Sequence, residues 1–110
     1  MYCLYTPTII SVSPRTVLLD GRRVAHTETL APGRRIDPLY EELVRQRREH
    51  PLLHPGEPFP GLVYYQLDPA VTAEQLRIVH QTCVEAGYDV PVCDRRGPAS
   101  ERCWQLPNAR

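Results

Sequence analysis

One window of the chain, residues 61–93, joins two strand patterns through a helix pattern and constrains the fold more than any other segment. Residues 61–67 (GLVYYQL) are rich in β-branched and aromatic side chains, which favour strands. Asp68-Pro69 ends this strand, because proline has no N–H to donate and restricts the residue before it. The short apolar run at residues 90–93 predicts a second strand. The connection is long enough for a crossover, so we expect a right-handed, parallel βαβ unit.

The helix inside this window has a marked beginning and end. Thr72 with Gln75 three residues later is typical of a capping box, in which each side chain bonds to a backbone N–H of the first turn. Gly87 predicts the end of the helix, because glycine readily adopts the left-handed conformation found there. Apolar residues at helical spacing form one face, namely Leu76, Val79, Cys83 and Ala86. We expect this face to pack on the sheet.

The segment before this window begins with β-type runs. Residues 8–13 and 16–20 are two such runs, separated by Pro14-Arg15. Asp20-Gly21 predicts a second tight turn, followed by a short run at residues 22–24. The pattern indicates an antiparallel meander of two strands and a short third one.

A first helix is expected over residues 38–49, with Asp37 as its N-cap and Pro38 at its first position. Its apolar face is formed by Leu39, Tyr40, Leu43 and Val44. Four prolines between residues 50 and 60 predict a loop that is neither helix nor central strand. The predicted fold is therefore α+β, with two helices on one face of a four- to five-stranded mixed sheet in the order β-β-α-β-α-β.

Length and charge exclude several function classes. The 110 residues suit one domain, and 13 basic against 13 acidic residues leave no net charge to favour nucleic acid as a partner. All the basic residues are arginine, so Schiff-base chemistry on lysine is excluded. No strand is followed by a glycine-rich phosphate loop, which argues against a nucleotide-binding domain. We expect neither a metal nor another cofactor.

Catalytic patterns are weak. His80 and Cys83 lie three residues apart on one helix, but Cys83 falls on the apolar face and the pattern supplies no third orienting group. Glu41 and Glu42 are adjacent on a helix, so their side chains diverge. His50 and His54 are interpreted as solvated residues of the proline-rich loop. The arginine pairs at 22–23 and 34–35 are also interpreted as solvated, and the alternative for these pairs is contact with an anionic partner. Of the strand tyrosines, one of Tyr64 and Tyr65 should face the core, and Trp104 is expected to cover the sheet edge.

The order and spacing of these elements resemble the periplasmic domain of the ExbD/TolR family of biopolymer-transport and stator proteins. The resemblance covers about residues 8–94 and rests on IISVS at 9–13, VLLDGRRV at 17–24, Leu67-Asp68 with Val71, and Glu85-Ala86-Gly87 with Val90. The sequence departs from the family at Ala73, where an aromatic residue is common, and in the long proline-rich loop. Nothing in the chain matches the family's membrane helix with its ion-coupling aspartate.

This resemblance implies a division of the chain into residues 1–7 as an extension after a missing anchor, 8–94 as the periplasmic domain and 95–110 as a tail. It implies a non-enzymatic domain of a single-pass inner-membrane protein that serves an energy-transducing complex driven by the proton-motive force. The implied partners are a second copy in a homodimer, an ExbB/TolQ-like channel subunit, and a TonB/TolA-like periplasmic protein or peptidoglycan. The first strand or the tail is expected to be the sheet edge that accepts a partner's strand.

The oxidising compartment that the resemblance implies favours disulfides among four cysteines without a CxxC spacing. Cys93 and Cys103 flank a turn-rich segment and are the preferred pair. A second pair, Cys3 with Cys83, stays open beside a free Cys83 that acts as a small core residue. The alternative function is a small stand-alone thiol or redox protein, or a ligand-binding α+β domain.

Overall fold

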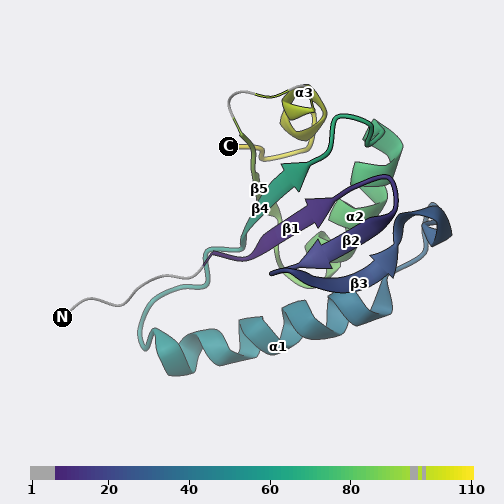
Figure 1. Ribbon diagram of the computed structural model, residues 1–110. Coiled ribbons are helices and arrows are strands. Elements are labelled where there is room, and N and C mark those ends of the chain that lie inside the picture. Colours follow the sequence, from purple (N-terminus) through teal and green to yellow (C-terminus); the bar gives the residue numbers. More distant parts are fainter. Residues whose placement is uncertain (1–6, 95–96, 98) are drawn as a thin grey trace.

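The computed structural model describes residues 7–94, 97 and 99–110 and has an α+β fold, as the sequence predicts (Figure 1). The strands are β1 (Ile9–Val12), β2 (Thr16–Leu19), β3 (Arg22–His26), β4 (Leu62–Leu67) and β5 (Val90–Val92). The helices are η1, a 3-10 turn (Thr27–Thr29), α1 (Asp37–Leu53), α2 (Ala73–Glu85) and α3 (Ser100–Trp104). A third strand is thus present, and α3 is an element that the sequence analysis missed.

The five strands form one mixed sheet in the order β3-β2-β1-β4-β5. β1 pairs antiparallel with β2 and parallel with β4, and β4 pairs parallel with β5, which confirms the βαβ unit. Asp20 and Gly21 join β2 to β3 with φ angles of 50° and 86°, as a tight hairpin turn requires. The prediction that the first strand is a sheet edge is wrong: β1 lies at the centre, because strands on both sides use its backbone groups.

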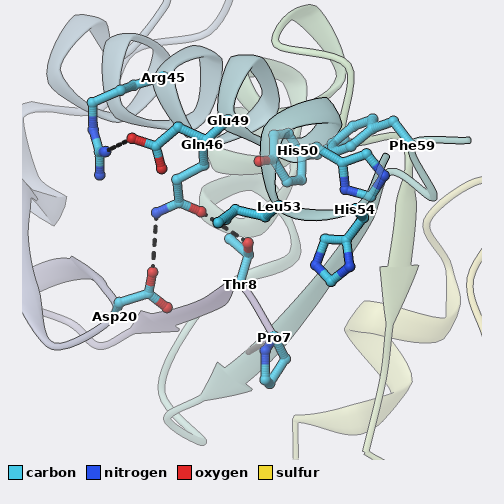
Figure 2. Close-up of a pocket in the computed structure, with 11 residues that line it drawn as sticks. Pro7, Thr8, Asp20, Arg45, Gln46, Glu49, His50, Leu53, His54 and Phe59 are labelled. Carbon is cyan, nitrogen blue, oxygen red and sulfur yellow. Dashed lines mark hydrogen bonds and ion pairs between the residues drawn. The ribbon is translucent and has the colours of Figure 1, made fainter. Parts of the chain in front are cut away.

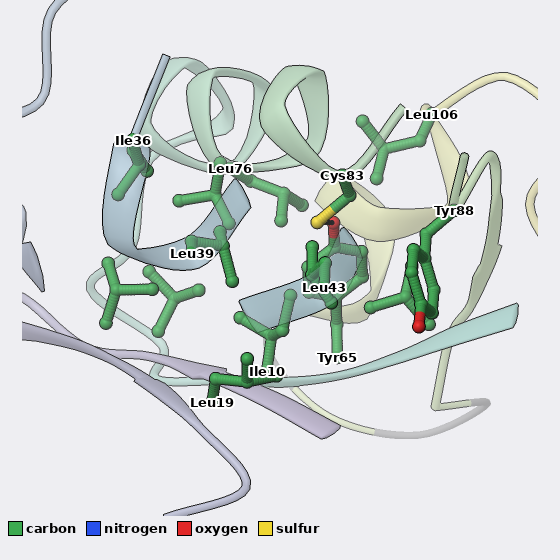
Figure 3. Packing of buried hydrophobic residues seen from close by; sticks show 14 of the residues in the cluster. Ile10, Leu19, Ile36, Leu39, Leu43, Tyr65, Leu76, Cys83, Tyr88 and Leu106 are labelled. Carbon is green, nitrogen blue, oxygen red and sulfur yellow. Dashed lines mark hydrogen bonds between the residues drawn. The ribbon is translucent and has the colours of Figure 1, made fainter. Parts of the chain in front are cut away.

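One face of the sheet is buried under α1 and α2, and alternate residues of β1, β2 and β4 supply it (Figure 3). The buried strand residues are Ile10, Val12, Val17, Leu19, Val63 and Tyr65. The two helices add Leu39, Leu43, Leu76, Val79 and Cys83 to the same cluster. Each of these side chains is at most 5% exposed, so a single core holds both helices against the sheet.

α2 begins and ends as its sequence predicts. The Thr72 hydroxyl accepts a hydrogen bond from the Gln75 N–H at 3.0 Å, and the Gln75 side chain accepts one from the Thr72 N–H at 3.0 Å. Gly87 follows the helix with a φ of 96°. A Cβ at Gly87 would lie 2.3 Å from a guanidinium nitrogen of Arg47, so this glycine also makes room for α1. The capping box and the glycine stop are both confirmed.

The start of α1 differs from the prediction by one residue. The N-cap is Ile36 rather than Asp37, and no side chain caps the helix. The Asp37 carboxylate instead accepts a hydrogen bond from Nε of Arg35 at 2.9 Å, which turns it away from the helix end. The Ile36 N–H donates to the Thr82 hydroxyl of α2 at 3.0 Å, a tertiary contact that the local sequence does not reveal.

The end of α1 corrects a second prediction, since residues 51–53 are helical although Pro51 was expected to lie in a loop. Proline removes one helical hydrogen bond, but here it stands in the last turn, where the loss is confined. His50 is buried, its Nε2 lies 3.2 Å from the Glu57 carbonyl, and its ring contacts Phe59 edge-on. These contacts hold the final turn despite the proline.

The carboxyl-terminal segment is part of the same body. Cys93 and Cys103 form a disulfide, the pair that the sequence favours, and Cys103 and Leu106 join the core. Arg110 donates its N–H to the Pro91 carbonyl at 2.9 Å, and its carbonyl accepts from the Cys93 N–H at 2.7 Å. The tail therefore covers the β5 edge and is not a free edge itself. Trp104 is 43% exposed, and its indole N–H donates at 3.2 Å to the carbonyl of Asp94, which lies just after the edge strand β5.

Replacing Thr72 with alanine should lower the free energy of unfolding by about 1 kcal/mol, because the first turn of α2 loses its side-chain cap. Urea denaturation followed by circular dichroism measures this change. Gln81→Ala is the matched control, since Gln81 is an exposed residue in the middle of the same helix. A loss for Thr72→Ala no larger than that of the control would contradict a stabilising role of the cap.

Candidate functional site

His80 and Cys83 are the residues whose spacing in the sequence most resembles a catalytic pair. In the structure a third side chain links them. The Tyr65 hydroxyl lies 2.7 Å from Nδ1 of His80. It also donates a hydrogen bond to Sγ of Cys83 at 3.4 Å (Figure 3). The phenol has one hydrogen, so when it bonds to the sulfur, Nδ1 of His80 is the donor to the phenol oxygen. Strand alternation places Tyr65 inward, and it is the orienting group that sequence reasoning did not assign.

Burial keeps all three groups neutral. It raises the pKa of the Cys83 thiol to about 12 and lowers the pKa of the His80 imidazole to about 4. Burial, followed by the proximity of Cys83, also raises the pKa of the Tyr65 phenol well above its usual value. A nucleophilic cysteine needs the opposite arrangement, a thiolate stabilised beside a cation. This chain of side chains has the properties of a buried link between β4 and α2.

Of the second predicted cysteine pair, Cys3 with Cys83, the structure describes only Cys83. Cys83 is a buried free thiol, which is the core role considered for it, while Cys3 lies outside the described residues. Within the described ranges, no three His, Cys, Asp or Glu side chains gather as metal ligands do.

A cleft of about 290 Å³ lies between the amino end of β1 and the last turns of α1 (Figure 2). The Thr8 hydroxyl donates to the Gln46 side-chain oxygen at 3.0 Å, and the Gln46 amide donates to the Asp20 carboxylate at 3.1 Å. The rings of His50 and His54 lie on the opposite side, with centroids 5.1 Å apart. Its walls thus mix polar groups that bond to one another with imidazole rings. Sequence reasoning had placed the two histidines in a solvated loop, whereas His50 is buried and half of the wall is helical.

The sheet face opposite the helices is a second candidate binding surface. Because paired residues of neighbouring strands point to the same side, the register assigns to this face the residues that alternate with the core. They are Ile9, Ser11, Leu18, Leu62, Tyr64, Gln66, Val90 and Val92. Most are half-buried by their neighbours, and both long helices lie on the other side. Tyr64 faces outward and Tyr65 inward, which confirms that the two tyrosines divide between the faces.

The two sheet edges are unequal. β5 has three residues, includes Pro91, and is covered by the backbone of Arg110. β3 has five residues, and no other strand in the described part of the chain pairs with its outer side. The accessible edge is therefore β3, which the sequence analysis did not single out.

Comparisons with protein-family models, with curated proteins and with solved structures found no match for this chain. Among the helices of the described residues, none combines the length and the apolar character needed to cross a bilayer.

The low pKa of His80 makes stability depend on pH. Below pH 6.5 the unfolded chain protonates this imidazole, while the folded protein resists protonation until about pH 4. Stability should therefore fall as the pH falls through this window, by about 1–2 kcal/mol between pH 7.5 and pH 5. Urea denaturation at both pH values should show a smaller fall for His80→Gln than for the wild type. His26→Gln, at an exposed position, should keep the wild-type fall, and an undiminished fall in His80→Gln would contradict the assignment.

The thiols provide a second test, best made in a Cys3→Ser background so that only the described cysteines contribute. Ellman's reagent should label no thiol rapidly in the native, oxidised protein, because Cys83 is buried and protonated. Denaturation in guanidinium should release one thiol per chain, which the additional change Cys83→Ala abolishes. Rapid labelling of one thiol in the native protein would instead support the redox alternative.

Proposed function

We propose that this chain is the periplasmic recognition domain of an ExbD/TolR-like component of an energy-transducing complex driven by the proton-motive force. The observation that supports this best is the one-sided architecture. Both long helices cover one sheet face, and the other face and the β3 edge are left to contact partners. The motifs that carry the family resemblance lie on β1, the β2–β3 hairpin, the end of β4 and the turn after α2.

In this role the domain acts by binding and not by catalysis. The partners that follow from the resemblance are a second copy, an ExbB/TolQ-like channel subunit, and either a TonB/TolA-like protein or peptidoglycan. Two observations agree with a non-catalytic role: the Cys83 thiol and the His80 imidazole are held neutral, and Tyr65 bridges them inside the core. The Cys93–Cys103 disulfide agrees with an oxidising compartment such as the periplasm.

The test follows the full product of the gene in its native cells, with an epitope at the carboxyl terminus. The proposal expects the product in the inner-membrane fraction, in a complex with a multi-helix membrane protein after mild detergent extraction. External protease should degrade this domain once the outer membrane is permeabilised, while a cytoplasmic marker stays intact. Recovery of the whole product with the cytoplasmic marker would overturn the proposal.

Co-sedimentation of the purified domain with peptidoglycan sacculi then separates the two ligand classes. Pelleting that soluble peptidoglycan fragments compete away supports the cell-wall role. Domain that stays in solution at saturating sacculi rejects peptidoglycan and leaves the periplasmic protein as the partner.

A further inference from the structure

The edge strand β3 stands out among the surfaces of this protein because it is accessible and begins with two adjacent arginines. Arg22 and Arg23 begin the strand, and both are exposed. Arg15 lies at its far end, where its carbonyl accepts a hydrogen bond from the Thr27 N–H at 3.0 Å. Among the ion pairs of the described residues, none uses these three arginines. Arg22 shares a cleft with Glu42 of α1, whose carboxylate its charge stabilises, while Arg15 and Arg23 keep their charge available to a partner.

The charge of the chain is divided along its length. Residues 9–29, which contain β1 to β3 and η1, carry three arginines and two acidic residues, a net charge of +1 with neutral histidines. The whole chain has a net charge of zero, so the rest is acidic by the same amount. Asp20 before β3 and Glu28 after it reduce this excess, so the positive charge at this edge of the sheet is carried by the exposed Arg22-Arg23 pair on β3 itself.

An edge strand offers backbone N–H and C=O groups to any extended segment that approaches it. Self-pairing of β3 between two copies would bring arginines close to arginines, so the like charges oppose that partner. An acidic strand meets the same backbone groups with attractive charges. The competing edge, β5, offers fewer groups, because Pro91 has no N–H and the backbone of Arg110 already bonds to the Pro91 carbonyl and the Cys93 N–H.

From these observations we propose that the β3 edge binds an extended acidic segment of another protein by strand addition. Backbone hydrogen bonds to β3 provide the register, and Arg22, Arg23 and Arg15 select for carboxylates on the added strand. The inference rests on the proposed recognition role of the domain, but it requires neither the family assignment nor a particular compartment.

The test uses the purified, oxidised chain and three capped, fluorescent nine-residue peptides. The first alternates glutamate with valine and threonine, the second has lysine in place of glutamate, and the third is the acidic peptide with N-methyl groups on alternate amides. Fluorescence anisotropy should show binding of the acidic peptide and about tenfold weaker binding of the other two. Equal binding of the N-methylated peptide would overturn strand addition, since charge alone would then account for binding.

Charge-reversal variants test the proposal through a change in preference between the acidic and the lysine peptide. A partial loss of stability would weaken the binding of both peptides and would not reverse this preference. The double variant Arg22→Glu with Arg23→Glu should lose the acidic peptide by about tenfold and gain the lysine peptide. Arg48→Glu with Arg77→Glu changes the net charge equally at exposed sites on α1 and α2, and it should keep the wild-type preference. An unchanged preference in the β3 variant would overturn the proposal. So would sedimentation that shows a dimer through β3, because a second copy would then occupy the edge. Failure of these peptide experiments leaves the cell-fractionation result for the proposed function unaffected.

Discussion

The packing of α1 and α2 on a single face of the sheet is the constraint on which the other features depend. Leu39 and Leu43 from one helix, and Leu76 and Val79 from the other, meet the inward residues of the strands in one cluster. At roughly 1.5–3 kcal/mol for each fully buried large apolar side chain, this burial is the main favourable term available to a domain of this size. The described part of the chain has two long helices, and because both lie on the same face, no described helix covers the opposite face of the sheet.

The same burial decides the chemistry of the side chains beneath the helices. Cys83 and His80 resemble a catalytic pair in sequence, but the core withdraws both from water and stabilises their neutral forms. Tyr65 then provides hydrogen-bond partners that a buried thiol and imidazole need. In the described part of the chain no buried side-chain nitrogen or oxygen lacks a partner, so this polar chain fits the core without an unpaired group. Burial thus favours the neutral forms of Cys83 and His80, which are the unreactive forms of a nucleophile and base pair.

The two edges of the sheet differ in how far they are covered, and this difference decides which edge can bind a partner. β5 is closed by Pro91, by the backbone of Arg110 and by the disulfide that holds the tail. β3 has no such cover among the described residues, and arginines at its ends take the protective role that charged residues have on natural edge strands. Charge of this kind discourages self-association and still permits an oppositely charged partner. A binding role for the domain is thus consistent with how its edges are built.

Local signals in the sequence determined those elements whose boundaries are marked by specific residues. These signals are the Thr72 capping box, the Gly87 helix stop, the Asp20-Gly21 turn and Asp68 at the end of a strand. Each of these signals depends on contacts between residues a few positions apart, so it can be recognised in the sequence alone. The tertiary structure alone decided features that need partners distant in sequence. His50 held the last turn of α1 past Pro51, β1 became central because β4 joined it, and Arg110 covered β5. Such outcomes depend on which surfaces meet once the core has formed, and no local pattern specifies them.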